Sequence, residues 1–382
     1  MRITCLVGNG LSIAFNPGLA VPRLTQALLD SFGSSGDPAL AVLARAVAER
    51  GEGFEQLLGP FDAAADALAS IPGFDIFAEQ RRPPLADVGT ALRRSRQFLQ
   101  DVYRAGVSIT LELIAELGRA TEGQARQEVV ERFCTAVAGL GEPEELTVAT
   151  LNYDGLLHAG FLTEVPVSDS RWDPNTRPLG QIADLADGSW GAERRIVVIP
   201  GQPPIEGHPL RTQDDLPLER IALLQLHGSL AWLRDPEDPS QIWKFNLEDL
   251  RGQAFWDRWG DGATDWEPVV VLTNRKEPAV GRWPFSLAYE AFTRRLADAD
   301  RWLMVGYGLG DAPVNRAFHE ARRRRGGAPP TLIIGRGGDV AAPRRRVSAH
   351  LGIPADRLRV SLQGAPEALE DAEWQAWLQD ED

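Results

Sequence analysis

The chain has 382 residues, of which 43% are hydrophobic and 25% charged, a composition typical of a folded globular protein rather than a disordered one. Its formal net charge of −14 does not favour a general attraction to nucleic acid, so no direct nucleic-acid binding is expected. Two cysteines without a CxxC pair exclude a disulfide framework and a zinc module, and the absence of a signal-peptide pattern or a long apolar run predicts a cytoplasmic protein without a membrane span.

Short apolar runs rich in valine, isoleucine and leucine predict the strands of this chain. Most of these runs lack polar alternation, which is expected for parallel strands that are covered on both faces. Helical patterns separate many of them, and this alternation predicts a Rossmann-like, doubly wound α/β fold with a mostly parallel sheet. The predicted strands lie at residues 3–7, 146–150, 195–199, 221–226, 269–273, 301–305 and 331–334, and the helices between them include 24–32, 284–298 and 313–325.

A nearly all-helical pattern replaces this alternation from about residue 36 to residue 143. We therefore predict a single domain over residues 1–382, whose core of 1–35 and 144–382 is interrupted by a helical insertion at 36–143. The helices expected in the insertion are 38–50, 54–69 and 85–117, with loop-like sequences at 71–73 and 82–84.

Two further stretches, at roughly 163–219 and 232–283, are expected to be irregular. The second holds six of the eleven tryptophans among acidic neighbours, which favours packing anchors over platforms for stacking bases. Basic runs at Arg322–Arg325 and Arg344–Arg346 are interpreted as solvated faces, with a docking patch for an acidic partner as the alternative.

The first motif, Val7-Gly-Asn-Gly-Leu-Ser12, joins the first predicted strand to a helix. Glycine lacks a Cβ and lets the backbone pass close to a ligand phosphate, and the N–H groups at the start of a helix favour an anion. Gly8, Asn9, Gly10 and Ser12 are therefore candidate nucleotide-binding residues. An ordinary tight turn is the alternative, because the third glycine of the usual dinucleotide fingerprint is missing.

The second motif, Thr150-Leu-Asn-Tyr-Asp154, lies at the carboxyl end of a predicted strand, where open α/β sheets gather ligand groups. Asn152 supplies an amide that can bind a ribose hydroxyl or hold a water, and Asp154 supplies a carboxylate. The alternative is that one of these two side chains caps the helix that starts near Gly155.

The third motif, Leu226-His-Gly-Ser229, follows another apolar strand. Imidazole titrates near neutral pH, which suits His227 to act as a general base, although a lone histidine is more often structural. The other four histidines are interpreted as structural or surface residues.

The fourth motif runs from Trp302 to Asp311 and again leads a strand through glycines into a helix. Its candidate residues are Gly306, Gly308, Asp311 and Asn315.

In this order, the motifs resemble the signatures of the sirtuin family: a glycine turn after the first strand, a Thr-x-Asn-x-Asp strand end and a Leu-His-Gly. The fourth segment is similar to Gly-Tyr-Ser-x-Gly-Asp followed by His-Ile-Asn, which is found in zinc-free sirtuin-like proteins of bacteria. Gly308 stands here where serine is frequent, and Val314 where isoleucine is. The resemblance covers about residues 1–33 and 146–365 and leaves the helical insertion out.

The resemblance implies NAD as a substrate and gives each motif a role. The first motif, including Gly8 and Ser12, would hold the pyrophosphate and the nearby ribose. Asn152 would engage the nicotinamide ribose or the attacking water, Asp154 would lie beside the carboxamide, and His227 would be the base near the ribose hydroxyls. The fourth motif would line the adenosine side of the NAD site.

Several sequence differences from the deacylating sirtuins argue against deacylation as the reaction of this protein. Those enzymes carry a four-cysteine zinc module after Leu-His-Gly, whereas no cysteine follows Cys134 here. Their Gly-Ile-Pro-Asp-Phe-Arg stretch is replaced by Gly18-Leu-Ala-Val-Pro-Arg23, which lacks the aspartate. The spacing between Asn152 and His227 is also longer. The expected reaction is therefore attack by water on C1′ of the nicotinamide ribose, with no metal site.

The resemblance thus predicts an NAD glycohydrolase that serves as an effector of bacterial anti-phage defence by abortive infection. Such proteins are activated by a partner or by oligomerisation, so we expect a homo-oligomer, a separate protein such as a HerA-like ATPase, or both. The helical insertion is the candidate interface. Two alternatives remain: a non-catalytic module that senses NAD or ADP-ribose, and an ADP-ribosyltransferase or deacylase.

Overall fold

The computed structural model describes residues 1–49, 51, 53–71, 85–119, 124–140, 145–164, 182–185, 195–197, 203–210, 221–273 and 276–379. The loop expected at 82–84, most of the loop at 71–73 and most of the irregular stretch 163–219 lie outside these residues.

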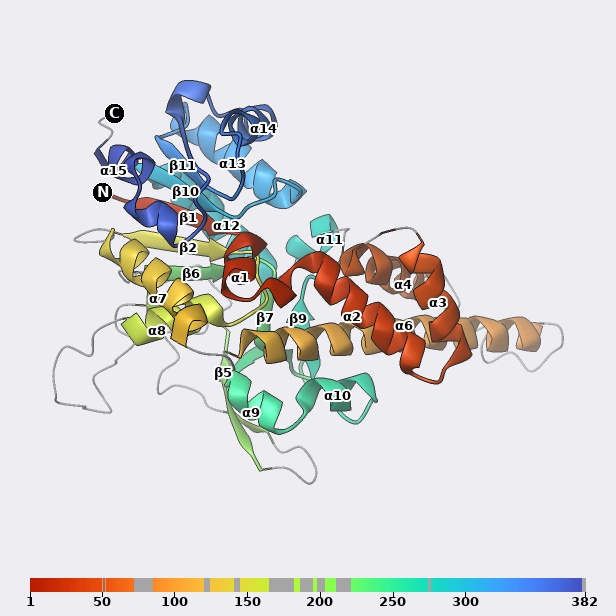
Figure 1. Cartoon of the computed structure of the whole chain (residues 1–382). Coiled ribbons are helices and arrows are strands. Elements are labelled where there is room, and N and C mark those ends of the chain that lie inside the picture. Colours follow the sequence, from red (N-terminus) through yellow and green to blue (C-terminus); the bar gives the residue numbers. More distant parts are fainter. Residues whose placement is uncertain are drawn as a thin grey trace.

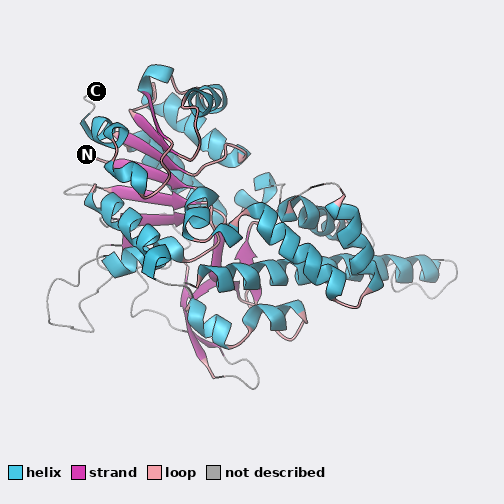
Figure 2. Cartoon of the chain, in the orientation of Figure 1, coloured by secondary structure: helices cyan, strands magenta, loops and turns pink. Residues whose placement is uncertain are grey.

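A seven-stranded sheet forms the centre of the molecule, and all of its strand pairs are parallel. Strand β1 (Ile3–Val7) lies between β2 (Leu146–Thr150) and β10 (Arg301–Val305), and every residue of these three strands is buried. The predicted doubly wound α/β fold is confirmed (Figures 1 and 2). The remaining strands of the order β12-β11-β10-β1-β2-β6-β3 are β3 (Ile182–Ala183), β6 (Ile221–Gln225), β11 (Thr331–Ile334) and β12 (Leu358–Ser361).

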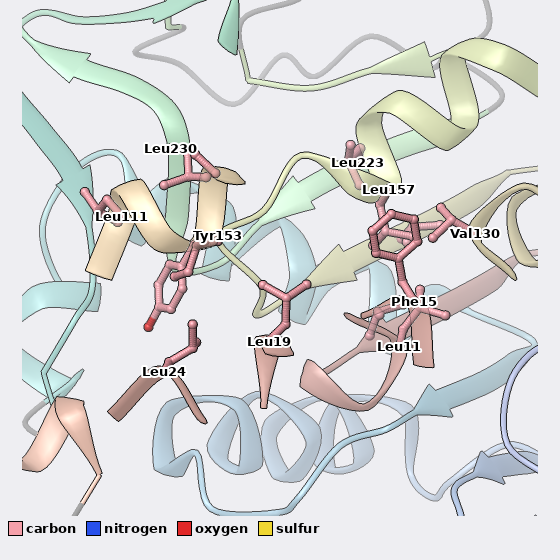
Figure 3. Packing of buried hydrophobic residues seen from close by; sticks show 14 of the residues in the cluster. Leu11, Phe15, Leu19, Leu24, Leu111, Val130, Tyr153, Leu157, Leu223 and Leu230 are labelled. Carbon is pink, nitrogen blue, oxygen red and sulfur yellow. The ribbon is translucent and has the colours of Figure 1, made fainter. Parts of the chain in front are cut away.

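Successive side chains of a strand point to opposite faces of the sheet, so the apolar strands present hydrophobic side chains on both faces. Helices cover each face and bury these side chains. In β1, Cys5 and Val7 belong to one hydrophobic cluster and Leu6 to the other. The Cys5 face packs on α1 (Asn9–Phe15), α7 (Gln124–Gly139) and α8 (Leu156–Glu164), as Figure 3 shows for Phe15, Val130 and Leu157. The opposite face packs on α12 (Phe285–Asp298), α13 (Ala312–Arg325) and α14 (Ala341–Leu351).

A second, antiparallel sheet corrects part of the strand prediction. The runs at 195–199 and 269–273 contribute β4 (Arg195–Val197) and β9 (Glu267–Val270) to this sheet instead of joining the central one. Their apolar composition suggested parallel strands, but β4 pairs antiparallel with a neighbouring strand, and so does β9. Both short strands stay partly exposed, as is usual for antiparallel sheets. The sheet has the order β4-β5-β8-β7-β9, with β5 (Ile205–Pro209), β7 (Gly228–Arg234) and β8 (Ile242–Phe245).

The stretch 232–283, expected to be irregular, is therefore built largely of strands and of the short helices α9 (Leu247–Gly252) and α10 (Phe255–Gly260). Its tryptophans act as packing anchors, as predicted: five of the six are buried, namely Trp232, Trp243, Trp256, Trp259 and Trp266.

Four helices, α2 (Val21–Ser34), α3 (Pro38–Ala48), α4 (Phe54–Ala69) and α6 (Leu85–Gly118), form a body beside the central sheet (Figure 1). Helix α2 packs on α3, α4 packs on α6, and α6 also packs on α10. Helix α7, although within 36–143, packs on α1 and α8 and so covers the sheet. The remaining elements are η1 (Pro17–Leu19), α11 (Lys276–Val280), η2 (Ala355–Arg357), η3 (Glu367–Glu370) and α15 (Ala372–Gln379).

The helices within the described ranges include none with the length and hydropathy that a membrane span requires. The single-domain boundaries and the limits of the insertion stay predictions.

Two glycine turns touch each other at the carboxyl edge of the central sheet. A Cβ on Gly10 would lie 2.5 Å from the Cα of Gly306, and a Cβ on Gly8 would lie 2.7 Å from the Gly306 carbonyl oxygen. Gly306 itself has a φ of +62°, which favours glycine. The close approach of these two backbones explains the glycines of the first motif without reference to a ligand.

Replacing Gly10 with alanine is expected to lower the free energy of unfolding by about 1–3 kcal/mol, because the added methyl group forces two backbones apart. The matched control is Gly308→Ala, where a Cβ would meet nothing within 4 Å. Chemical denaturation of both variants measures the difference. Equal stabilities for the two variants would contradict the close packing of the two turns.

Candidate functional site

A cavity of about 1200 Å³ opens at the carboxyl edge of the central sheet and contains parts of all four motifs. It is lined by residues of the turns after β1, β2, β6 and β10, by residues of α2, α3, α4 and the connections between them, and by residues of α11. Of the predicted site residues, the cavity is lined by Gly8, Asn9, Gly10, Asn152, Asp154, His227, Gly306, Gly308 and Asp311. Ser12 and Asn315 do not line it but bond to residues that do.

The strand register explains why the motifs meet. Val7 lies opposite both Thr150 and Val305, which are the last residues of their strands, so the chain leaves the sheet at the same level after β1, β2 and β10. The backbone N–H of Gly8 donates to the carbonyl of Val305 at 2.8 Å, and that of Leu151 donates to the carbonyl of Val7 at 3.0 Å. Residues far apart in the sequence are thereby fixed at one edge.

The first two motifs form a buried polar cluster. Asn152 Nδ2 donates to the Gly8 carbonyl at 3.2 Å and to Ser12 Oγ at 2.8 Å, and Ser12 Oγ donates to Asp154 Oδ2 at 2.6 Å. All three side chains are less than 10% exposed. Asn9 lies apart from this cluster, because its Nδ2 donates to the carbonyl of Leu19 at 3.1 Å.

Asp154 combines a site position with helix capping. Its Oδ1 accepts from the backbone N–H of Leu156, the first residue of α8, at 3.2 Å. Its other oxygen accepts from Ser12. Burial raises the pKa of Asp154 above its usual range, and the hydrogen bonds from Ser12 and Leu156 oppose that rise. The capping alternative for Asp154 therefore holds alongside its position in the cavity wall.

His227 lies between β6 and β7, and its side chain is buried. Its Nε2 is 3.0 Å from Asp311 Oδ2 and 3.3 Å from Tyr289 Oη, and its ring stacks on that of Tyr153 at 6.2 Å between centroids. The next residue, Gly228, has a φ of +84°, and a Cβ there would lie 2.1 Å from the Val269 carbonyl oxygen, so the Leu-His-Gly motif requires its glycine.

The environment of His227 favours a neutral imidazole. Burial lowers its pKa below the usual value of 6.5, and the positive charge of Lys276 lowers it further, whereas Asp311 and Glu55 raise it. A ring that donates its Nε2 hydrogen to Asp311 keeps Nδ1 unprotonated. The arrangement therefore provides an oriented, neutral base near pH 7.

Asp311, which the sequence assigned to the adenosine side, lies against the predicted base. Its Oδ1 accepts from the backbone N–H of Val314 at 3.0 Å and so caps α13, while Oδ2 faces His227 and is 3.3 Å from Lys276 Nζ. Burial opposes ionisation of Asp311, but His227 and Lys276 outweigh it and hold the pKa of Asp311 below its usual range. Its role in nucleotide binding stays a prediction.

Asn315 makes hydrogen bonds to two residues of the fourth motif. Its Oδ1 accepts from Tyr307 Oη at 2.7 Å, and its Nδ2 donates to the carbonyl of Leu309, which has a φ of +64°. Arg346 of α14 donates to the Gly308 carbonyl at 2.9 Å. These contacts fix the loop between β10 and α13 that lines the cavity.

Sequence reasoning missed Glu55, Lys276, Tyr153 and Tyr289, all of which lie around His227. Glu55 lies in the first turn of α4, within the predicted insertion, and its carboxylate accepts from Tyr153 Oη at 2.9 Å and pairs with Lys276 at 3.3 Å. Of these four residues only Tyr153 stands within a recognised motif, so the sequence carried no signal for the other three. Among the residues whose placement is described, no group of three or more His, Cys, Asp or Glu could hold a metal ion.

Ser12→Ala is expected to lower the free energy of unfolding by about 1–3 kcal/mol, because the buried Asn152 amide and Asp154 Oδ2 each lose the hydrogen bond that they make with Ser12 Oγ. Ser34→Ala is the matched control, since that hydroxyl lies on the exposed end of α2. Thermal or chemical unfolding compares the two. A Ser12→Ala protein as stable as Ser34→Ala would contradict the buried cluster.

Two comparisons with known proteins bear on this site. A search of curated proteins found no match. The family model for the SIR2-like domain matches residues 146–355, which is more than half of the chain and includes the second, third and fourth motifs but not the first. Members of that family typically use NAD in their reactions. The chain therefore belongs to the SIR2-like family and is expected to have an NAD-related activity.

Proposed function

We propose that the protein hydrolyses NAD to ADP-ribose and nicotinamide. The observation that carries the proposal is the placement of a neutral, oriented His227 and of Asn152 on the same cavity as the two glycine turns. A water oxygen forms the new bond to C1′ of the nicotinamide ribose, and the bond between C1′ and the nicotinamide nitrogen breaks. Nicotinamide leaves as a neutral molecule with the bonding electrons, and the proton of the water passes to the base.

The geometry supports one orientation of NAD. Gly8, Gly10, Gly306, Gly308 and Gly310 expose backbone along the cavity, which suits a pyrophosphate and the adenosine beside it. Asn152 and His227 lie at the ends of neighbouring strands and suit the nicotinamide ribose. Holding water, ribose and base in one enclosed geometry is a major source of rate enhancement for such a step.

Catalysis is favoured over simple sensing by the surroundings of His227. A module that only binds NAD has no need of a neutral imidazole held by a buried carboxylate, whereas a general base needs both features. The wider role that we propose is depletion of NAD in anti-phage defence, with activation by oligomerisation or by a separate protein such as a HerA-like ATPase. The support for that role is the resemblance of the four motifs to zinc-free sirtuin-like proteins.

Replacing His227 or Asn152 with alanine is expected to lower the rate of nicotinamide release by roughly 100-fold or more, because the first loses the base and the second loses the group that positions the ribose or the water. Chromatography of NAD incubations follows nicotinamide, with the protein alone and with the products of neighbouring genes. His319→Ala is the control, because that ring is exposed and lies outside the cavity. Unchanged release by both cavity variants would disprove the assignment, and bound but intact NAD under every condition would indicate a sensor.

The pH dependence of nicotinamide release follows from the direction of the His227 shift. Because burial lowers the pKa of His227 below 6.5, the base stays neutral at pH 6.5, and kcat/KM should fall only as the pH drops below that value. Rates measured between pH 4.5 and about 8 locate this acid limb. An acid limb above pH 7 would contradict a buried base with this environment.

A further inference from the structure

A row of four charged or titratable groups links helix α4 to the predicted base. Glu55 Oε2 lies 3.3 Å from Lys276 Nζ, Lys276 Nζ lies 3.3 Å from Asp311 Oδ2, and Asp311 Oδ2 lies 3.0 Å from His227 Nε2. The charges of Glu55, Lys276 and Asp311 alternate in sign, and the neutral imidazole of His227 lies at hydrogen-bond distance from Asp311. Each neighbouring pair is therefore attractive, and the row ends at the imidazole.

The row becomes more buried toward the base. The exposed fraction of the side chain is 27% for Glu55, 17% for Lys276, 5% for Asp311 and 3% for His227. Charge interactions strengthen as water is excluded, so these pairs are coupled more strongly than surface ion pairs. Among the described residues that line the cavity, Lys276 is the one lysine or arginine.

Glu55 also reaches the base by a second route. Its Oε1 accepts from Tyr153 Oη at 2.9 Å, and the Tyr153 ring stacks on the ring of His227. The Tyr153 hydroxyl also lies 2.8 Å from the carbonyl oxygen of Val271. One carboxylate on α4 thus contacts both the cation and the aromatic ring that surround His227.

We propose that Glu55 and Lys276 are positioning residues of the NAD reaction, and that the helical body completes the active site by supplying Glu55. Glu55 holds Lys276 against Asp311 and holds Tyr153 against His227. Neither residue is required to touch the reacting atoms. The proposal rests on the proposed NAD hydrolysis for its catalytic consequence, but the effect on the imidazole can be measured without turnover.

The groups that face His227 come from five parts of the chain: Asp311 after β10, Lys276 in α11, Glu55 in α4, Tyr289 in α12 and Tyr153 after β2. Lys276 disfavours the protonated imidazole, whereas Glu55 and Asp311 favour it. Neutralising Lys276 should therefore raise the pKa of His227, and neutralising Glu55 should lower it. A purely structural role for the two residues predicts no such opposition of sign.

The first measurement is a pH titration of His227 in the full chain with carbon-13-labelled histidine. The chain has five histidines, and the signal lost in His227→Gln assigns the resonance. The variants are Glu55→Gln and Lys276→Gln, with Asp66→Asn as the matched control, because Asp66 is an exposed carboxylate on the same helix and outside the cavity. We expect a higher pKa in Lys276→Gln, a lower pKa in Glu55→Gln and no change in Asp66→Asn.

The second measurement is nicotinamide release from NAD by the same proteins. Glu55→Gln and Lys276→Gln should lower kcat by roughly tenfold or more, with a smaller effect on KM, because a displaced base costs more in the reaction than in binding. The acid limb of kcat/KM should move in the same direction as the pKa of His227 in each variant. Glu55→Asp keeps the charge and should recover part of the lost rate.

The outcomes separate the two proposals. Shifts of the same sign, or an unmoved resonance in both variants, would overturn the positioning role whatever the activity. If the wild-type protein releases no nicotinamide while the two pKa shifts appear with opposite signs, NAD hydrolysis fails and the coupling of α4 to the imidazole stands. If Glu55→Gln does not fold, Lys276→Gln still decides the matter through the same titration, because a pKa of His227 that does not rise in this variant would overturn the coupling.

Discussion

The parallel register of β2, β1 and β10 is the constraint on which the rest of the structure depends. Val7, Thr150 and Val305 lie at one level, so three chain segments separated by more than a hundred residues leave the sheet side by side. Open α/β sheets collect their ligand groups at this edge. The register brings Ser12 within reach of Asn152 and Asp154, and the contact between the two glycine turns closes the same edge. Each motif is short, and its position in the sheet places its side chains beside those of the other motifs at one cavity.

Several side chains at this edge have two functions at once. Asp154 and Asp311 each cap a helix with one oxygen and face the cavity cluster with the other. Capping fixes the carboxylate, and the fixed carboxylate then orients Ser12 in one case and His227 in the other. The capping and site interpretations of Asp154 are therefore compatible, since both use the same carboxylate. In the same way, Gly10 and Gly306 are required by backbone packing and also line the cavity.

The sequence predicted strands β1, β2, β6, β10 and β11 of the central sheet and the helices 38–50, 54–69 and 85–117, because these depend on local patterns, but it missed β3 and β12. It failed for β4 and β9, whose apolar runs resemble parallel strands but pair with a separate antiparallel sheet. It also failed for Glu55 and Lys276. An acidic residue at the start of a helix normally lies in water, and only the packing of α4 beside the sheet brings it to His227. Contacts between distant segments of this kind leave no periodic signal in the chain.

The most direct test of the account is a crystal structure of the full-length His227→Ala protein with NAD, in which turnover is blocked. The account predicts the pyrophosphate beside Gly8–Gly10, the adenosine beside the loop that begins at Gly306, and the nicotinamide ribose between Asn152 and the position of the missing imidazole. Glu55 and Lys276 should keep their contact with Asp311. NAD bound in the reverse orientation, or outside this cavity, would contradict the proposed site and the reaction assigned to it.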